Sequence, residues 1–264
     1  MHKWIICFDL DGTLVFDNKI HLADVKLLAN PTDITFVPVT ARPLGSIRRL
    51  FERNSLYIGH SIPFYMVLLN GSAIYTSGEH LIRQYPIDPD VEKSIFNMTC
   101  PFQGVNTLAL SVDKIYSFCE NDFSKDMTNR FDFIVQPFAD HARAGDINKI
   151  MCISQEYEAL GNILEQLKHF PVVASFSLPG VLEITAEGIN KGGGIKSLID
   201  SVGLSDCRIC AVGDGENDLP MFDLAEISFA PSTSPEFIQA KADHIIVPSK
   251  NGILSPILNY LNFL

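Results

Sequence analysis

The first third of the chain alternates between short apolar runs, typical of buried strands, and segments with helical spacing. The expected elements are a strand at 4–8, a helix at 22–29, a strand at 34–39, a helix at 43–53 and a strand at 64–69. Strands that alternate with helices pair in parallel, because each connection must cross back over the sheet. The alternation therefore predicts a parallel sheet with helices packed against it.

This pattern returns near the end of the chain, with a helix at 195–202, a strand at 207–212, a helix starting near Pro220 and strands at 227–230 and 244–247. The middle differs. Its apolar segments lie at 106–110, 115–118, 131–135, 147–153 and 172–178, with a helix at 155–169. Turn-rich stretches flank it. We therefore expect a doubly wound, Rossmann-like α/β core of residues 1–84 and 183–264, interrupted by a smaller α/β domain at 85–182.

Charge and composition exclude several classes of protein. With 20 basic and 31 acidic residues, the net charge of -11 disfavours nonspecific binding to nucleic acid or to anionic membranes. The N-terminus lacks the pattern of a signal peptide, and no apolar stretch reaches the roughly 18 residues that a bilayer span requires. We expect a cytoplasmic protein. The six cysteines are scattered, and the Cys207 to Cys210 spacing falls inside a predicted strand, so neither metal nor redox use is expected.

Four predicted strands end in polar residues, namely Asp9, Thr40, Asn70 and Asp214. The carboxyl ends of parallel strands meet at the edge where open α/β sheets bind ligands. Asp9 and Asp11 stand two residues apart, and two close carboxylates need either a cation or a division into acid and base. We therefore expect the chemistry at this edge.

Lys191 precedes three glycines at the start of a predicted helix, where the helix dipole disfavours a cation. An anion would relieve this conflict. Free backbone amides, glycines that permit close approach and an ammonium together favour a phosphate site, although a solvated lysine is the alternative.

A second acidic cluster, from Gly213 to Asp218, follows the strand at 207–212. A calcium loop and a solvated turn are its alternatives, and the calcium loop is weakened because the distal glutamate is missing and a strand enters the cluster. Asp9, Asp11 and Asp214 offer oxygen ligands, with no cluster of histidines or cysteines to suit zinc. This set favours Mg²⁺.

Four ordered segments carry a family resemblance: Asp9-Leu10-Asp11-Gly12-Thr13, Val39-Thr40-Ala41-Arg42, Lys191-Gly192 and Gly213-Asp214-Gly215-Glu216-Asn217-Asp218. The chain resembles the haloacid dehalogenase-like superfamily along nearly its whole length. The insertion, Asn70-Gly71 and the form of the last motif resemble the Cof-like subgroup, which has a type IIB α/β cap. One departure is Ala41, which stands where the family commonly has glycine.

The resemblance implies a role for each matched residue. Asp9 would be the nucleophile that forms an aspartyl-phosphate, and Asp11 the group that protonates the leaving oxygen and later activates water. Mg²⁺ would bind the Asp9 side chain, the Asp11 main-chain carbonyl and Asp214. The phosphate would contact Thr40, Ala41, Lys191 and Asn217, with Arg42, Asn70 and Asp218 in support. Asp218 would act either through a water on the metal or by holding Lys191.

The leading hypothesis is a Mg²⁺-dependent phosphatase, a phosphoric monoester hydrolase acting on a small phosphorylated metabolite such as a sugar phosphate. A phosphosugar mutase with the same aspartyl-phosphate is the first alternative. Its cap should present cations for a second phosphate, and Lys114, Lys125, Arg130 and Arg143 are the candidates. A non-catalytic phosphometabolite-binding protein is the second alternative. The oligomeric state is not predicted.

Overall fold

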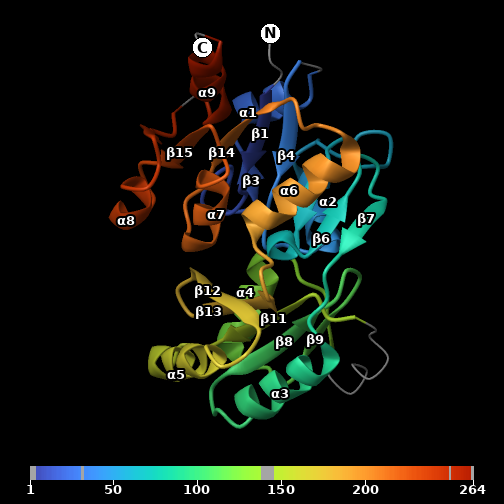
Figure 1. The fold of residues 1–264 in the computed structure, drawn as a ribbon, viewed down its shortest axis with the longest axis vertical. Helices are drawn as coiled ribbons and strands as arrows, with labels where there is room; N and C mark the ends of the chain where they lie inside the picture. Colours follow the sequence, from blue (N-terminus) through green and yellow to red (C-terminus); the bar gives the residue numbers. More distant parts are fainter. Residues whose placement is uncertain (1–3, 31–32, 138–145, 250, 263–264) are drawn as a thin grey trace.

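The computed structural model describes residues 4–30, 33–137, 146–249 and 251–262. The chain forms two α/β units, one above the other in Figure 1. The upper unit contains both the beginning and the end of the chain, and the lower unit is inserted between them. None of the described helices combines the length and the apolar character that a bilayer crossing requires.

The upper unit, called the core below, is built on a parallel sheet in the order β16-β15-β14-β1-β4. Its strands are β1 (Trp4–Phe8), β4 (Thr35–Pro38), β14 (Arg208–Val212), β15 (Ile227–Pro231) and β16 (His244–Ile246). Strand β1 is apolar and buried throughout because it lies inside the sheet with both faces covered. The alternation that predicted a doubly wound parallel sheet is confirmed.

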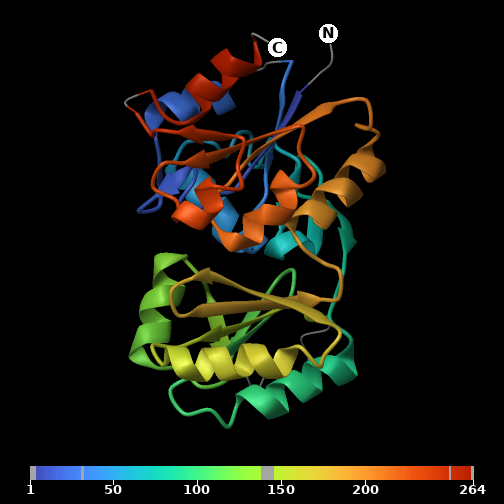
Figure 2. The same ribbon diagram turned by 60° about the vertical axis from the view of Figure 1, so that its left-hand side comes forward.

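Helices cover both faces of this sheet (Figure 2). Ile6 and Phe8 belong to the apolar cluster that includes α1 (Leu22–Leu28), α2 (Leu44–Arg53) and α9 (Leu254–Leu261). Ile5 and Cys7 point the other way, to the cluster that includes α6 (Lys191–Val202), α7 (Leu219–Phe222) and α8 (Glu236–Gln239). Successive residues of β1 thus contact helices on opposite faces of the sheet.

Two small antiparallel elements complete the core. One is the hairpin of β2 (Val15–Phe16) and β3 (Lys19–Ile20). The other is the sheet of β5 (Met66–Leu68), β6 (Ala73–Tyr75) and β7 (Leu81–Gln84). A parallel bridge between Val39 and Val67 places β5 beside β4. The end of β5, which leads into the 3-10 turn η1 (Leu69–Gly71), therefore reaches the same edge as β1 and β4.

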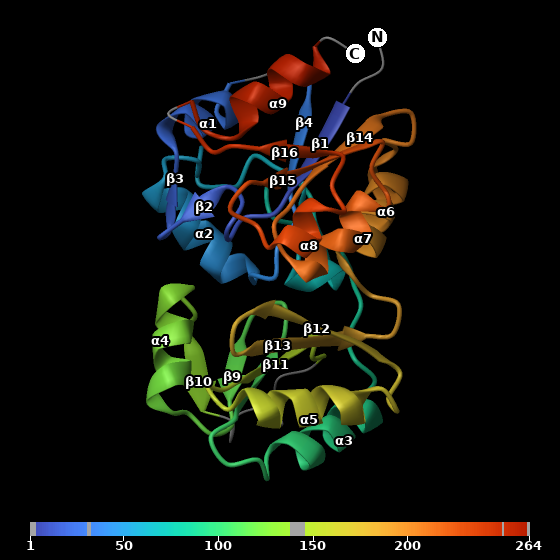
Figure 3. The same cartoon turned by 90° about the vertical axis from the view of Figure 1, so that its left-hand side faces the viewer.

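The lower unit, called the cap below, has a mixed sheet in the order β10-β9-β8-β11-β13-β12. Its strands are β8 (Asn106–Leu110), β9 (Ile115–Ser117), β10 (Val135–Pro137), β11 (Lys149–Ile153), β12 (Val172–Leu178) and β13 (Val181–Ala186). Figure 3 shows α3 (Pro89–Thr99) and α5 (Tyr157–Leu167) on the side of this sheet away from the core. Helix α4 (Asp122–Arg130) stands at one end of the sheet.

Alternation along β11 separates the two faces of the cap sheet. Ile150 and Cys152 pack in the cluster that includes α3 and α5. Met151 and Ile153 belong instead to the apolar cluster of the core. The cap therefore rests on the core through the face of its sheet that carries Met151 and Ile153.

The apolar segment at 131–135 does not form a single element, because Phe131 caps α4 and β10 begins only at Val135. The sequence reasoning missed α3 and α4, although Asp88 before Pro89 and the capping box at Asn121 are helix-start signals.

The boundary expected between residues 182 and 183 falls inside β13, which pairs with β11 and β12 along its length. A domain boundary inside β13 would divide hydrogen bonds between strands that belong to a single sheet. We propose that the cap extends to Ala186, with the core resuming after it.

Candidate active site

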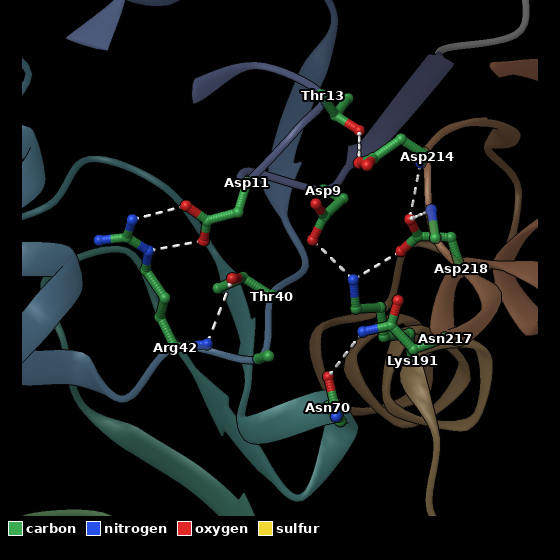
Figure 4. Close-up of polar contacts among 12 residues, drawn as sticks. Asp9, Asp11, Thr13, Thr40, Arg42, Asn70, Lys191, Asp214, Asn217 and Asp218 are labelled. Carbon is green, nitrogen blue, oxygen red and sulfur yellow. Dashed lines mark hydrogen bonds and ion pairs between the residues drawn. The ribbon is translucent and has the colours of Figure 1, made fainter. Parts of the chain in front are cut away.

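Four segments far apart in the sequence meet at the carboxyl edge of the core sheet. Asp9 follows β1, Thr40 follows β4, Asp214 follows β14, and Lys191 begins α6 (Figure 4). The backbone fixes Asp9 beside the neighbouring strand, because its N–H donates to the carbonyl of Val212 at 2.9 Å. The edge predicted to carry the chemistry brings these side chains together.

Lys191 connects two of the carboxylates. Its Nζ donates to Asp9 Oδ1 at 2.6 Å and to Asp218 Oδ1 at 2.5 Å, and all three side chains are buried. Burial by itself lowers the pKa of Lys191, but the carboxylates of Asp218 and Asp9 outweigh it and raise the pKa above its ordinary value. The two carboxylates therefore favour the positively charged form of Lys191.

The two acids of the first motif point in different directions (Figure 4). Asp9 faces Lys191, whereas Asp11 faces Arg42, whose Nε and Nη2 donate to its two oxygens at 2.7 and 2.6 Å. Arg42 is buried and is also bonded to Ser46 and Asn18. Asp9 and Asp11, which the sequence suggested would repel each other, thus contact two different cationic side chains.

Asp9, Asp214 and Asp218 form a group whose carboxylate oxygens lie within 4.8 Å of one another, which suits a metal ion. Lys191 contacts one oxygen of Asp9, and Thr13 Oγ1 donates to one oxygen of Asp214 at 2.6 Å. The second oxygen of each is left for a cation. Asp218 differs, because its Oδ2 accepts from the amides of residues 214 and 215 while its Oδ1 accepts from Lys191. It is the least suited of the three to be a direct ligand.

Electrostatics favour a cation here. Burial raises the pKa of Asp9 well above its ordinary value, against the lowering effect of Lys191. Burial, with the neighbouring Asp218, raises the pKa of Asp214 to about 7. A divalent ion between two such carboxylates stabilises their ionised forms. An all-oxygen donor set fits a hard cation such as Mg²⁺.

Two of the glycines after Lys191 lie in close contact with neighbouring segments. A Cβ on Gly192 would lie 2.2 Å from the Pro220 carbonyl oxygen, and one on Gly194 would lie 2.5 Å from Val67 Cγ1. The amide of Gly193 already donates to the side chain of Asn190 at 2.9 Å. Gly192 and Gly194 therefore allow α6 to pack closely against its neighbours and so place Lys191 at the site.

The segment from Thr40 to Arg42, called the phosphate loop below, is held by the neighbouring η1 turn. The Thr40 carbonyl accepts from Asn70 N at 3.1 Å, and the Arg42 carbonyl accepts from Leu69 N at 3.3 Å. The Asn70 side chain accepts from Asn217 Nδ2 at 3.4 Å. Asn70 and Asn217, both expected near the site, thus lie in contact with each other.

A cavity between the core and the cap opens onto these residues. Its core side is formed by Asp9, Asp11, Thr40, Ala41, Arg42, Asp214, Asn217 and Asp218. Lys191 and Asn70 line a neighbouring cavity instead. Phe131, Phe133, Met151, Leu178, Val181 and Glu183 form much of the cap side. Sequence reasoning missed these cap residues, because they carry no motif and the alternation in β11 and β13 does not reveal which face meets the core.

Comparisons with known proteins agree with this arrangement. A family model described as haloacid dehalogenase-like hydrolase matches residues 6–257. The chain is 25% identical over 275 residues to the 5-amino-6-(5-phospho-D-ribitylamino)uracil phosphatase YwtE of Bacillus subtilis, with 94% of each protein covered. The structure matches that of the subclass IIB sugar phosphatase BT4131 with a TM-score of 0.80 and 22% identity, over 98% of this chain and 99% of that one. It matches TM0651 from Thermotoga maritima with a TM-score of 0.75 and 26% identity, over 97% of this chain and 96% of that one.

Proposed function

The chain belongs to the haloacid dehalogenase-like hydrolase family and is a phosphatase, and from this premise we propose that it hydrolyses a small phosphomonoester through an aspartyl-phosphate on Asp9, with Mg²⁺ as its metal. The observation that carries the proposal is the position of Asp9. Its buried carboxylate lies between Lys191 and Asp214 at the floor of the cavity under the cap.

Binding of the phosphoryl group falls to the residues around Asp9. Lys191 supplies a permanent positive charge 2.6 Å from the nucleophile, where it neutralises charge on the equatorial oxygens during transfer. Thr40 and Ala41 offer a hydroxyl and a backbone amide from the phosphate loop, and Asn217 offers an amide from the opposite side. Asp218 orients Lys191 through its 2.5 Å contact.

Proton transfer falls to Asp11. Its side chain lines the same cavity as Asp9, but it is turned toward Arg42 and away from Lys191. From that position it donates a proton to the departing oxygen and then removes one from the water that hydrolyses the aspartyl-phosphate. Arg42 keeps the carboxyl group in its orientation between the two steps.

The side chains of Asp9 and Asp214, with the main-chain carbonyl of Asp11, would hold Mg²⁺. The ion would neutralise charge on the phosphoryl oxygens and keep both carboxylates ionised. Thr13 would orient Asp214 through its hydrogen bond to Oδ1, which leaves the other oxygen for the metal.

The cavity limits the class of substrate. Its described cap residues are mainly apolar, with Phe131, Phe133 and Met151 among them and Glu183 as an acid, and they include neither Lys nor Arg. Such a surface suits an uncharged leaving group with an apolar face, and it would repel or leave unpaired a second anionic group. YwtE and BT4131 are named for a phosphoribitylamino-uracil and for sugar phosphates. Both kinds of substrate are consistent with the proposal of a small phosphorylated metabolite.

The same cavity argues against a mutase. Lys125 lies in an exposed pair with Glu120, and Arg130 lies over the ring of Phe131, with 5.7 Å between Cζ and the ring centroid. Neither lines the cavity, nor does Lys114. Arg143 lies outside the described residues. The alternative of a non-catalytic phosphometabolite-binding protein gains no support from the described residues, because they include every proposed catalytic group.

Release of inorganic phosphate tests the proposal. Purified protein would be incubated with sugar phosphates, nucleotides and cofactor phosphates in the presence of Mg²⁺, with EDTA and the Asp9→Asn variant as controls. We expect turnover with one class of monoester and its loss in both controls. Full activity in Asp9→Asn would exclude Asp9 as nucleophile, and hexose phosphate interconversion without phosphate release would indicate the mutase.

A further inference from the structure

Two charged side chains of the cap are buried at its contact with the core. Lys149 on β11 and Glu183 on β13 are 0% and 2% exposed, and their Nζ and Oε1 atoms are 2.8 Å apart. Both project from the sheet face that rests on the core. A buried ion pair contributes little net stability compared with apolar packing, because both charges lose their hydration. Stability alone therefore does not explain why a pair of charges lies there.

Each member of the pair also binds the core. Lys149 Nζ donates to the main-chain carbonyl of Ala41 at 2.6 Å. The second oxygen of Glu183 accepts from Asn70 Nδ2 at 2.5 Å. Asn70 in turn contacts Asn217. A continuous polar chain thus runs from the cap into the residues that surround the phosphoryl site.

The contact with Ala41 completes the hydrogen bonding of the phosphate loop. The core itself supplies donors to the carbonyls of Thr40 and Arg42, from the amides of Asn70 and Leu69. The carbonyl between them receives its donor from the cap, through Lys149. All three carbonyls of the loop are therefore satisfied together only when the cap rests on the core.

We propose that Lys149, oriented by Glu183, is a positioning residue that couples closure of the cap to the catalytic shape of the phosphate loop. The proposal rests on the proposed function, in which this loop binds the transferring phosphoryl group. When the cap is open, the carbonyl of Ala41 loses its ammonium partner, and only two of the three loop carbonyls keep the donors described above. When the cap closes, the loop is held in place beside Asp9.

Glu183 has a second effect on Lys149. Burial lowers the pKa of Lys149, and the adjacent Glu183 carboxylate opposes that shift. Glu183 therefore favours the charged form of the ammonium that the cap brings to the loop. The positive charge of Lys149 also lies near the carboxylates of the site, where it favours an incoming phosphate.

A pair of variants separates positioning from simple stabilisation. Lys149→Met leaves Glu183 buried without its cation, so both the melting temperature and kcat should fall. In the double variant Lys149→Met/Glu183→Gln both charges are gone, and the introduced amide oxygen can still accept from Asn70. We expect its melting temperature to recover toward wild type. Its kcat with p-nitrophenyl phosphate should stay lower by about tenfold or more, because the Ala41 carbonyl still lacks its donor from the cap.

Two further variants complete the test. Lys149→Arg keeps a cation and a donor for the Ala41 carbonyl, so it should retain more of the wild-type kcat than Lys149→Met does. Arg53→Ala breaks a different ion pair between core and cap, with Asp132, which lies at the surface and does not touch the loop. It should change kcat by less than about twofold.

Recovery of both melting temperature and kcat in the double variant would overturn the inference, as would equal kcat losses in Lys149→Arg and Lys149→Met. If the double variant does not fold, that second comparison decides alone. Failure of the proposed function is distinguishable, because the wild-type protein itself would then release no phosphate.

Discussion

Arg42 holds Asp11 through both of its carboxylate oxygens, with Nε and Nη2 at 2.7 and 2.6 Å. The guanidinium also lies over the ring of Phe131 from the cap, with 5.1 Å between Cζ and the ring centroid. One side chain therefore orients the proposed proton carrier and contacts the cap above it. Asp11 is thus connected through Arg42 to both the core and the cap.

Replacing Arg42 by lysine should lower kcat by about tenfold or more, because a single ammonium cannot hold both oxygens in one plane. Steady-state kinetics with p-nitrophenyl phosphate would measure the loss. Arg48→Lys is the matched control, since Arg48 lies on α2, just after Arg42, and pairs with Glu79 without lining the cavity. Equal kcat values for the two variants would show that the planar contact to Asp11 does not matter.

Thr13→Val should weaken Mg²⁺ binding by about tenfold or more, because Asp214 loses the 2.6 Å hydrogen bond that orients it. The dependence of phosphate release on Mg²⁺ concentration would report this change. Thr13→Ser retains a hydroxyl and should stay near wild type. The same Mg²⁺ requirement in both variants would remove Thr13 from the metal site.

Stability should respond to pH through Asp214. Folding raises the pKa of Asp214 to about 7 from an ordinary value near 4. Between these values the folded protein binds a proton that the unfolded chain has released. The free energy of unfolding of the metal-free protein therefore falls as pH rises across this window. Bound Mg²⁺ would remove this penalty by favouring the ionised form.

We therefore expect Mg²⁺ to raise the melting temperature more at about pH 8 than at about pH 5, where the metal must displace a proton. Thermal unfolding with and without MgCl₂ at the two pH values would measure the difference. In Asp214→Asn the difference should shrink. An equal increase at both pH values in the wild-type protein would contradict the prediction.

Gly194→Ala should destabilise the protein by about 1–3 kcal/mol, because its Cβ would lie 2.5 Å from Val67 Cγ1 and 2.6 Å from Gly71 Cα. Gly193→Ala is the matched control in the same helix, where the nearest atom to a new Cβ is 3.5 Å away. It should be neutral or stabilising by up to about 1 kcal/mol. Urea denaturation of both variants would test this difference, and equal midpoints would refute the packing role of Gly194.

Local patterns were enough to predict much of the core. The run from Trp4 to Phe8 is apolar throughout because both sheet faces are covered, and Asp9 follows it because the strand ends there. The cap was harder to predict. Phe131 and Phe133 resemble part of a strand in the sequence, yet they form a connection after α4 and line the cavity. These two apolar side chains line the cavity and are not part of a strand.

By itself, the sequence determined the parallel core, the order of the four motifs and the residues that gather at the sheet edge, because each rests on short-range patterns joined by a simple topology. Tertiary structure decided the partners of those residues. Arg42 reaches Asp11 and Lys149 reaches Ala41 only because the chain folds back across large sequence separations. Which face of the cap sheet meets the core depends on where its helices pack, and alternation along a strand describes both faces equally.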